Sequence, residues 1–136
     1  FHSCADDVFI EYGLHMDYGD SITIGARSYI NAGCTIVDAP SSAQQNIAIG
    51  SDCLIGPNVQ LLAVTHDMQG SERLMKHNYA QNITIGNNVW LGGGVIVLGG
   101  VTIADNCVIG AGSVVTKNTD SNSFYAGNPA VKIRSL

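Results

Sequence analysis

The chain has 136 residues, of which 46% are hydrophobic and only 12% are charged, and its formal net charge at pH 7 is −5. This length predicts one domain, residues 1–136. The acidic balance argues against a nucleic-acid partner. No run of about eighteen apolar residues occurs, so we expect no transmembrane helix and no membrane partner. We also expect no N-terminal signal peptide.

Aliphatic residues recur at every sixth position through most of the chain. The registered runs are Ile24, Ile30 and Ile36, then Ile49, Ile55 and Leu61, then Ile85, Leu91, Val97, Ile103, Ile109 and Val115. A small or β-branched residue follows most of them four positions later. A period of six is typical of a hexapeptide β-helix, in which three hexapeptides make one triangular coil. We therefore predict an all-β fold, a parallel β-helix of about four to five coils, left-handed as hexapeptide helices are as a class.

The first twenty-odd residues lie before this period. Cys4 lies outside the period and, like His2 and His15, is assigned no role. Cys34, Cys53 and Cys107 fall on the small inward position, which predicts that they pack in the core as small hydrophobic residues. Four cysteines without a CxxC pair favour a reducing compartment, and we expect a cytoplasmic protein.

The period breaks first between Ile36 and Ile49. Their separation is one residue more than two hexapeptides, which predicts a bulge or short loop around residues 38–42. Asp38 stands at its start, and we expect it to orient a neighbour or to cap the bulge.

The second break covers about residues 66–82, which show no hexapeptide pattern although the register is kept across them. This stretch contains His66 and His77. A long irregular stretch in a compact repeat protein is usually functional or disordered. We predict a loop that projects from the wall of the β-helix and carries part of a site.

After Val115 the period ends, in a C-terminal tail of about residues 116–136. Lys117, Lys132 and Arg134 lie in this tail with one acid, Asp120. A solvated tail and an anion site, for example for phosphates, both fit this composition.

Several segments together resemble the maltose and galactoside O-acetyltransferases, a hexapeptide branch that includes nodulation acetyltransferases. These segments are Asn31–Asp38, Ile55–Val59, Thr65-His66, Ile83–Gly92, Gly110–Lys117 and Gly127–Ala130. The resemblance covers nearly the whole chain, from about Asp17 to Arg134. It implies a left-handed β-helix, acetyl-CoA as co-substrate, and a homotrimer with sites between subunits. A sugar or similar small hydroxyl compound is the implied acceptor.

The resemblance also implies roles for individual residues. His66 matches the general base, and Asp17 and Asn31 match positions near the acceptor. The positions implied for acetyl-CoA are Trp90, Gly93, Ala111, Thr116, Lys117 and Arg134. Trp90 follows an inward residue, so it should face outward, either at a subunit seam or beside the pantetheine arm.

Histidine suits acyl transfer to a hydroxyl because its ordinary pKa lies near neutrality, so it can accept the proton of the attacking oxygen. We expect direct attack on the thioester, with neither a covalent enzyme intermediate nor a required metal. Three alternatives stay open. They are an antibiotic or amino-sugar acceptor, a non-catalytic trimeric scaffold, and a metal-dependent hexapeptide hydratase of the carbonic anhydrase type.

Overall fold

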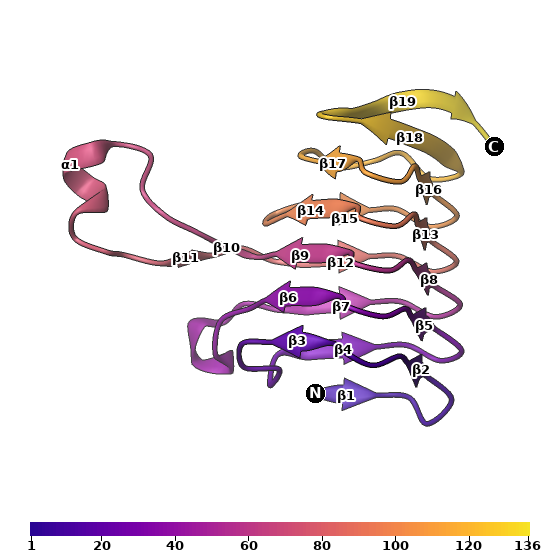
Figure 1. Cartoon of the computed structure of the whole chain (residues 1–136), viewed down its shortest axis with the longest axis horizontal. Helices are drawn as coiled ribbons and strands as arrows, with labels where there is room; N and C mark the ends of the chain where they lie inside the picture. Colours follow the sequence, from indigo (N-terminus) through magenta and orange to yellow (C-terminus); the bar gives the residue numbers. More distant parts are fainter.

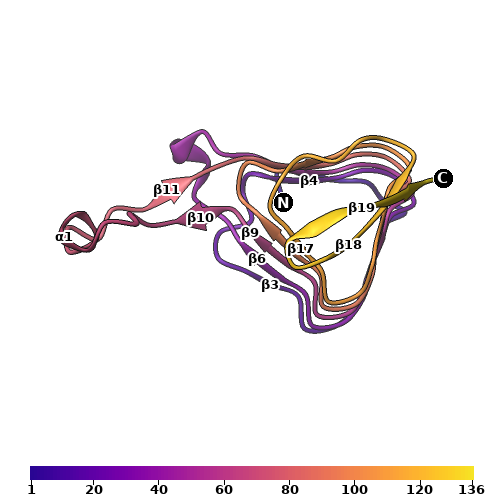
Figure 2. The same cartoon turned by 90° about the horizontal axis from the view of Figure 1, so that it is seen from above.

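The computed structural model describes residues 1–136 and shows a left-handed parallel β-helix, as the six-residue period predicts. Flat coils stack on one another in Figure 1, and in Figure 2 each coil is a triangle seen along the axis. One repeat cannot bury its apolar face alone, so the coils are stable only as a stack. One irregular segment lies far outside the wall of this stack.

Each side of the triangle is a sheet whose strands run parallel, except for the last strand of the second sheet. The first sheet has the order β1 (Ser3–Cys4), β4 (Ile22–Ile24), β7 (Ile47–Ile49), β12 (Ile83–Ile85), β15 (Thr102–Ile103). The second contains β2 (Phe9–Ile10), β5 (Tyr29–Ile30), β8 (Leu54–Ile55), β13 (Trp90–Leu91), β16 (Val108–Ile109), β18 (Ser123–Gly127) and β19 (Ala130–Ser135). The third contains β3 (His15–Met16), β6 (Thr35–Val37), β9 (Gln60–Leu62), β14 (Ile96–Leu98) and β17 (Val114–Val115).

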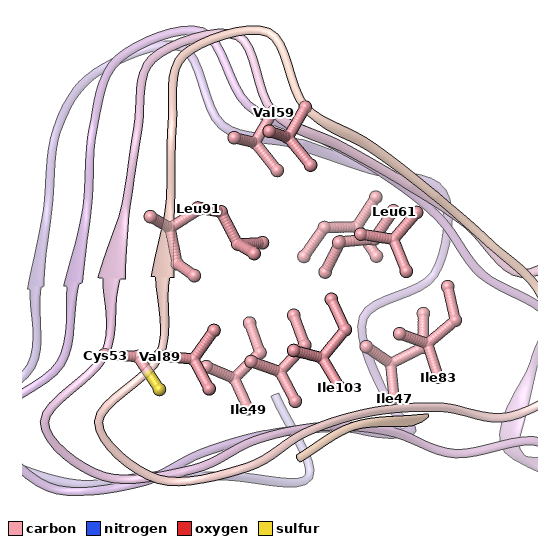
Figure 3. Packing of buried hydrophobic residues seen from close by; sticks show 14 of the residues in the cluster. Ile47, Ile49, Cys53, Val59, Leu61, Ile83, Val89, Leu91 and Ile103 are labelled. Carbon is pink, nitrogen blue, oxygen red and sulfur yellow. The ribbon is translucent and has the colours of Figure 1, made fainter. Parts of the chain in front are cut away.

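The aliphatic residues of the period form the core. They point into the triangle from all three sides and stack in columns along the axis, as Figure 3 shows for Ile49 and Ile103. Cys34, Cys53 and Cys107 are buried among them, which confirms their predicted packing role.

The prediction that Cys4 stands outside the period is wrong. Cys4 pairs in register with Ile24, and Ile10 and Met16 likewise pair with the next coil, so residues 3–16 form a first coil of the same kind. The spacing from Met16 to Ile24 is eight rather than six, and this longer turn hid the coil from the sequence pattern.

The corner between the first and second sheets is held by polar side chains. Asn88, Asn106 and Asn122 have φ values of 54°, 59° and 52°, in the left-handed region that asparagine tolerates. Asn88 Nδ2 donates to Asn106 Oδ1 at 2.9 Å, and Asn106 Nδ2 donates to Asn122 Oδ1 at 3.0 Å. These asparagines therefore both turn the chain and tie successive coils together.

Both predicted interruptions are present. The first contains a short 3₁₀ helix, η1 (Ser41–Ala43). The second leaves the third sheet through β10 (Val64–Thr65), turns in α1 (Gly70–Arg73) and returns through β11 (Tyr79–Ala80). β10 and β11 pair antiparallel, so the segment is a ribbon with an open tip, and it projects far from the stack in Figure 1. We call residues 66–80 the projecting loop.

The C-terminal tail is not an extended solvated segment. β18 adds to the second sheet beside β16, and β19 pairs antiparallel with β18, so the two strands form a hairpin at the end of the stack. Neither helix of the structure is long and apolar enough to span a membrane.

Candidate functional site

The outer face of the second sheet carries an apolar column that the sequence analysis missed. The residues aligned across its strands are Phe9, Tyr29, Leu54, Trp90, Val108 and Phe124. We call them the outer ladder. The aligned outward residues of the first sheet are instead small or polar: Ser3, Thr23, Ala48, Thr84 and Thr102. The signal was present in the sequence, because apolar residues precede the aliphatic position on one side of the triangle.

Trp90 faces outward, as predicted, and 53% of its surface is exposed. Phe9 and Leu54 on the same ladder are also more than half exposed, at 59% and 54%. A continuous exposed apolar column of this kind marks a place where a ligand or another chain binds.

A groove of about 730 Å³ runs along the outer ladder. Its lining includes Asn31, Trp90, Gly93, Ala111 and Arg134. The structure therefore brings together four of the six residues predicted to bind acetyl-CoA, with one of the two predicted near the acceptor.

The chain approaches itself closely on one side of this groove. A methyl group added at Gly92 would lie 2.6 Å from the backbone nitrogen of Ala111 on the next coil, so the position admits no side chain. The groove thus combines apolar side chains from the ladder, bare backbone at Gly92 and Gly93, and the cation of Arg134. A long, largely apolar ligand with an anionic end fits these features.

The other predicted site residues lie elsewhere on the chain. Asp17 lines a second cavity of about 550 Å³, together with Tyr18, Asp38 and Tyr79. Thr116 and Lys117 line a third, polar cleft of about 1,060 Å³. His66 contributes to none of these linings and stands on the exposed ribbon that begins at β10. One chain alone therefore leaves the predicted residues in separate places around the coil.

The imidazole of His66 is oriented by the returning half of the projecting loop. His66 Nδ1 lies 3.2 Å from the main-chain carbonyl oxygen of His77. A carbonyl can only accept, so Nδ1 carries the hydrogen, and in the neutral ring Nε2 is left as an exposed acceptor. This is the tautomer in which Nε2 can remove a proton.

The base of the projecting loop carries a second polar contact. The Asp67 carboxylate beside the Tyr79 hydroxyl raises the pKa of Tyr79 above its ordinary value. The residue next to His66 therefore interacts with the returning strand of the ribbon.

The basic residues of the tail do not act as one patch. Lys132 Nζ lies 3.4 Å from Asp120 Oδ2, so its charge is partly balanced. Lys117 and Arg134 make none of the three ion pairs in the structure. Two cations are thus available to an anion, one in the polar cleft and one in the groove.

No group of three or more His, Cys, Asp or Glu side chains is close enough to hold a metal ion.

Fold and site together are those of a hexapeptide-repeat β-helix with a ligand groove on one face, and comparisons with known proteins give the family. Residues 82–117 match the family described as "Bacterial transferase hexapeptide (six repeats)". The chain is 40% identical to the galactoside O-acetyltransferase of Escherichia coli strain K12 over 136 residues, all of this chain and 64% of that protein.

Two solved structures are also similar. A maltose O-acetyltransferase from Clostridium difficile 630 superposes with a TM-score of 0.90 at 37% identity, over 96% of this chain and 67% of that one. A hexapeptide-repeat acetyltransferase from Vibrio cholerae, complexed with acetyl coenzyme A, superposes with a TM-score of 0.93 at 30% identity. The match covers 100% of this chain and 72% of that one. The chain belongs to the hexapeptide-repeat acetyltransferase family, in the branch of the maltose and galactoside O-acetyltransferases. It spans 64–66% of the length of the first curated relatives that it matches.

Proposed function

We propose that this protein is an acetyl-CoA-dependent O-acetyltransferase that acetylates a hydroxyl of a sugar or similar small molecule. The observation that carries the proposal is the groove along the outer ladder, which gathers Trp90, Gly93, Ala111 and Arg134. Its apolar walls suit a pantetheine arm, and the guanidinium of Arg134 suits a phosphate. Relatives named for acetyl transfer to galactosides and maltose support a sugar as the acceptor.

His66 is the general base in this proposal. Its exposed Nε2 accepts the proton of the acceptor hydroxyl while that oxygen attacks the thioester carbonyl carbon. The C–S bond then breaks, and the proton passes from His66 to the leaving thiolate. The products are the acetyl ester and CoA, and no covalent enzyme intermediate forms. Backbone N–H groups at Gly92, Gly93 and Gly94 are the candidate donors to the oxyanion of the tetrahedral intermediate.

The proposed assembly is a homotrimer with its sites between subunits. One chain leaves His66, the groove and the polar cleft with Lys117 on different parts of its surface, so a site that uses all three needs a second copy. The projecting loop also exposes Met68, Leu74 and Met75 at 89%, 75% and 68%. Apolar side chains this exposed on a projecting segment favour contact with another chain. We place this assembly in the cytoplasm, where the four free cysteines would stay reduced.

The proposal is tested by following the release of CoA thiol from acetyl-CoA in the presence of maltose, methyl β-galactoside, an amino sugar and a hydroxyl-bearing antibiotic. Acetyl-CoA-dependent turnover that requires a sugar supports the proposal, and mass spectrometry of the product identifies an ester or an amide. Turnover only with the amino sugar or the antibiotic would reassign the acceptor. No turnover, combined with no binding of acetyl-CoA by calorimetry, would favour a non-catalytic scaffold.

A further inference from the structure

We infer that Asp38 is a positioning residue that holds the acceptor-contacting segment Asp17–Gly19 in place. This segment is the longer turn between the first and second coils. Asp38 starts the next interruption, one coil further along the stack, so its carboxylate reaches back to the turn. The inference rests on the proposed function for the role of Asp17, but its structural basis is independent of it.

Asp38 is buried, with 2% of its surface exposed, and it makes none of the three ion pairs in the structure. An ionised carboxylate in such a place is costly unless hydrogen bonds replace its water. Oδ1 accepts from the backbone nitrogens of Asp17 and Tyr18, both at 3.1 Å, and Oδ2 accepts from Gly19 at 2.7 Å. The expectation that Asp38 orients a neighbour is therefore confirmed.

Three backbone donors in a row specify a carboxylate. Its two oxygens offer about four acceptor positions, whereas an asparagine of the same size offers one oxygen and presents N–H groups at the other end. Gly19 has φ +86°, so the turn also needs a residue that tolerates the left-handed region. The turn thus depends on a charge brought from a neighbouring coil rather than on the hexapeptide pattern.

The location of the turn separates a positioning role from a purely structural one. Asp17, Tyr18 and Asp38 line the same 550 Å³ cavity as Tyr79 of the projecting loop. Asp38 holds the backbone of Asp17, and His15 holds its side chain: His15 Nε2 lies 2.9 Å from Asp17 Oδ1. Asp38 therefore sets where the backbone presents Asp17 to the cavity, and His15 sets where its side chain points.

The decisive variant is Asp38→Asn, with Asp20→Asn as the matched control. Asp20 lies in the same stretch and also accepts two hydrogen bonds, from the backbone nitrogen and hydroxyl of Ser41, but it does not line the cavity. We expect Asp38→Asn to raise KM for the sugar acceptor by roughly tenfold or more and to leave KM for acetyl-CoA within about twofold. Asp20→Asn should change neither value by more than about twofold.

A double variant tests whether Asp38 acts through Asp17. In Asp17→Ala the contacting carboxylate is already lost, so adding Asp38→Asn should raise KM for the acceptor little further. Independent, multiplying effects would overturn the inference, as would an equal rise of both KM values in Asp38→Asn. If Asp38→Asn shows no cooperative thermal unfolding transition, the same comparison of KM values is made on Asp38→Ser, which removes the carboxylate without placing N–H groups against the turn.

Saturation-transfer NMR with methyl β-galactoside and maltose separates failure of this inference from failure of the proposed function. Turnover by the wild type with an unchanged acceptor KM in Asp38→Asn overturns the inference alone. In another outcome the wild type binds the sugar without turnover, Asp38→Asn loses this binding and Asp20→Asn keeps it. That outcome supports the inference and overturns the proposed function. Neither binding nor turnover by the wild type overturns both.

Discussion

The Nδ1 atom of His66 lies 3.2 Å from the main-chain carbonyl oxygen of His77, across the ribbon that forms the base of the projecting loop. The two residues are eleven positions apart, and they meet because β10 and β11 pair antiparallel. A main-chain carbonyl fixes one tautomer without adding a charge. The contact therefore prepares Nε2 to accept a proton and leaves the chemistry of the acceptor to the rest of the site.

Removing this imidazole should abolish most of the activity without changing the fold. We expect His66→Ala to lower kcat by roughly 10²–10⁴-fold, the usual contribution of a general base. The side chain is exposed, so the melting temperature should stay close to that of the wild type. His2→Ala, which removes an exposed histidine near the N-terminus, is the control. An unchanged kcat in His66→Ala would remove His66 from the mechanism.

The stacked coils of this fold could be predicted from the sequence. For the two irregular segments the sequence predicted only where they interrupt the period, not how they fold. A strict spacing of six places Ile85, Leu91 and Val97 on three sides of one coil because each hexapeptide makes one strand and one corner. The first coil escaped detection because its inward residues include Cys4 and Met16 and because a longer turn follows it. Local spacing carries no information about a turn that is stabilised from another coil, as Asp38 stabilises this one.

The site shows the same division. The resemblance to known acetyltransferases predicted site residues on several sides of the β-helix. The structure places three of them, Trp90, Gly93 and Arg134, in one groove. It leaves Asp17 and Lys117 in other cavities. Spacing along one chain cannot show which residues meet across a subunit boundary. The contact between His66 and the His77 carbonyl was also out of reach, because it depends on how an irregular loop folds back on itself.

The two cations of the C-terminal tail that make no ion pair, Lys117 and Arg134, should contribute to binding of acetyl-CoA rather than of the acceptor. We expect Lys117→Ala and Arg134→Ala each to raise KM for acetyl-CoA by roughly tenfold, since a charge-assisted hydrogen bond to a phosphate is lost. Arg27→Ala is the control for net charge, because Arg27 pairs with Asp52 at a different corner. A larger rise in KM for the acceptor than for acetyl-CoA would contradict this assignment.

The exposed apolar tip of the projecting loop should be covered by a second subunit. The chain has a mass of 14.3 kDa, so the proposed trimer has a mass of three times that, about 43 kDa. We expect sedimentation equilibrium to give this mass for the wild type and a lower mass for Leu74→Asp, with activity lost in parallel. Tyr12→Asp is the control, because Tyr12 is also exposed, at 82%, but lies on the first coil. A wild-type mass of 14.3 kDa at assay concentration would contradict the shared site.

The buried thiols should resist alkylation. Burial raises the pKa of both Cys34 and Cys53, and the thiolate is the form that reacts. A raised thiol pKa means that less thiolate forms at a given pH, so the protection should persist as the pH rises to about 8.5, where a free cysteine is half ionised. Iodoacetamide should modify Cys4 first in the native protein and all four cysteines in denaturant, as counted by mass spectrometry. Cys4→Ser should remove the fast reaction, and early labelling of Cys34 or Cys53 would show that the core opens.

Close stacking of the coils at Gly92 should make this glycine irreplaceable. In Gly92→Ala the new methyl group would meet the backbone nitrogen of Ala111 at 2.6 Å, and its other near neighbours are also backbone atoms of the next coil, which cannot move aside as a flexible side chain would. We expect overpacking to lower the free energy of unfolding by about 1–3 kcal/mol or more, measured by urea denaturation. Gly70→Ala is the matched control, since no atom lies within 4 Å of its added methyl group, and alanine favours the helix that begins there. Equal stability of Gly92→Ala and the wild type would mean that adjacent coils separate here more readily than their spacing indicates.

Gly92→Ala should also weaken the binding of acetyl-CoA in the proposed groove, because the coils that would move apart form one of the walls of that groove.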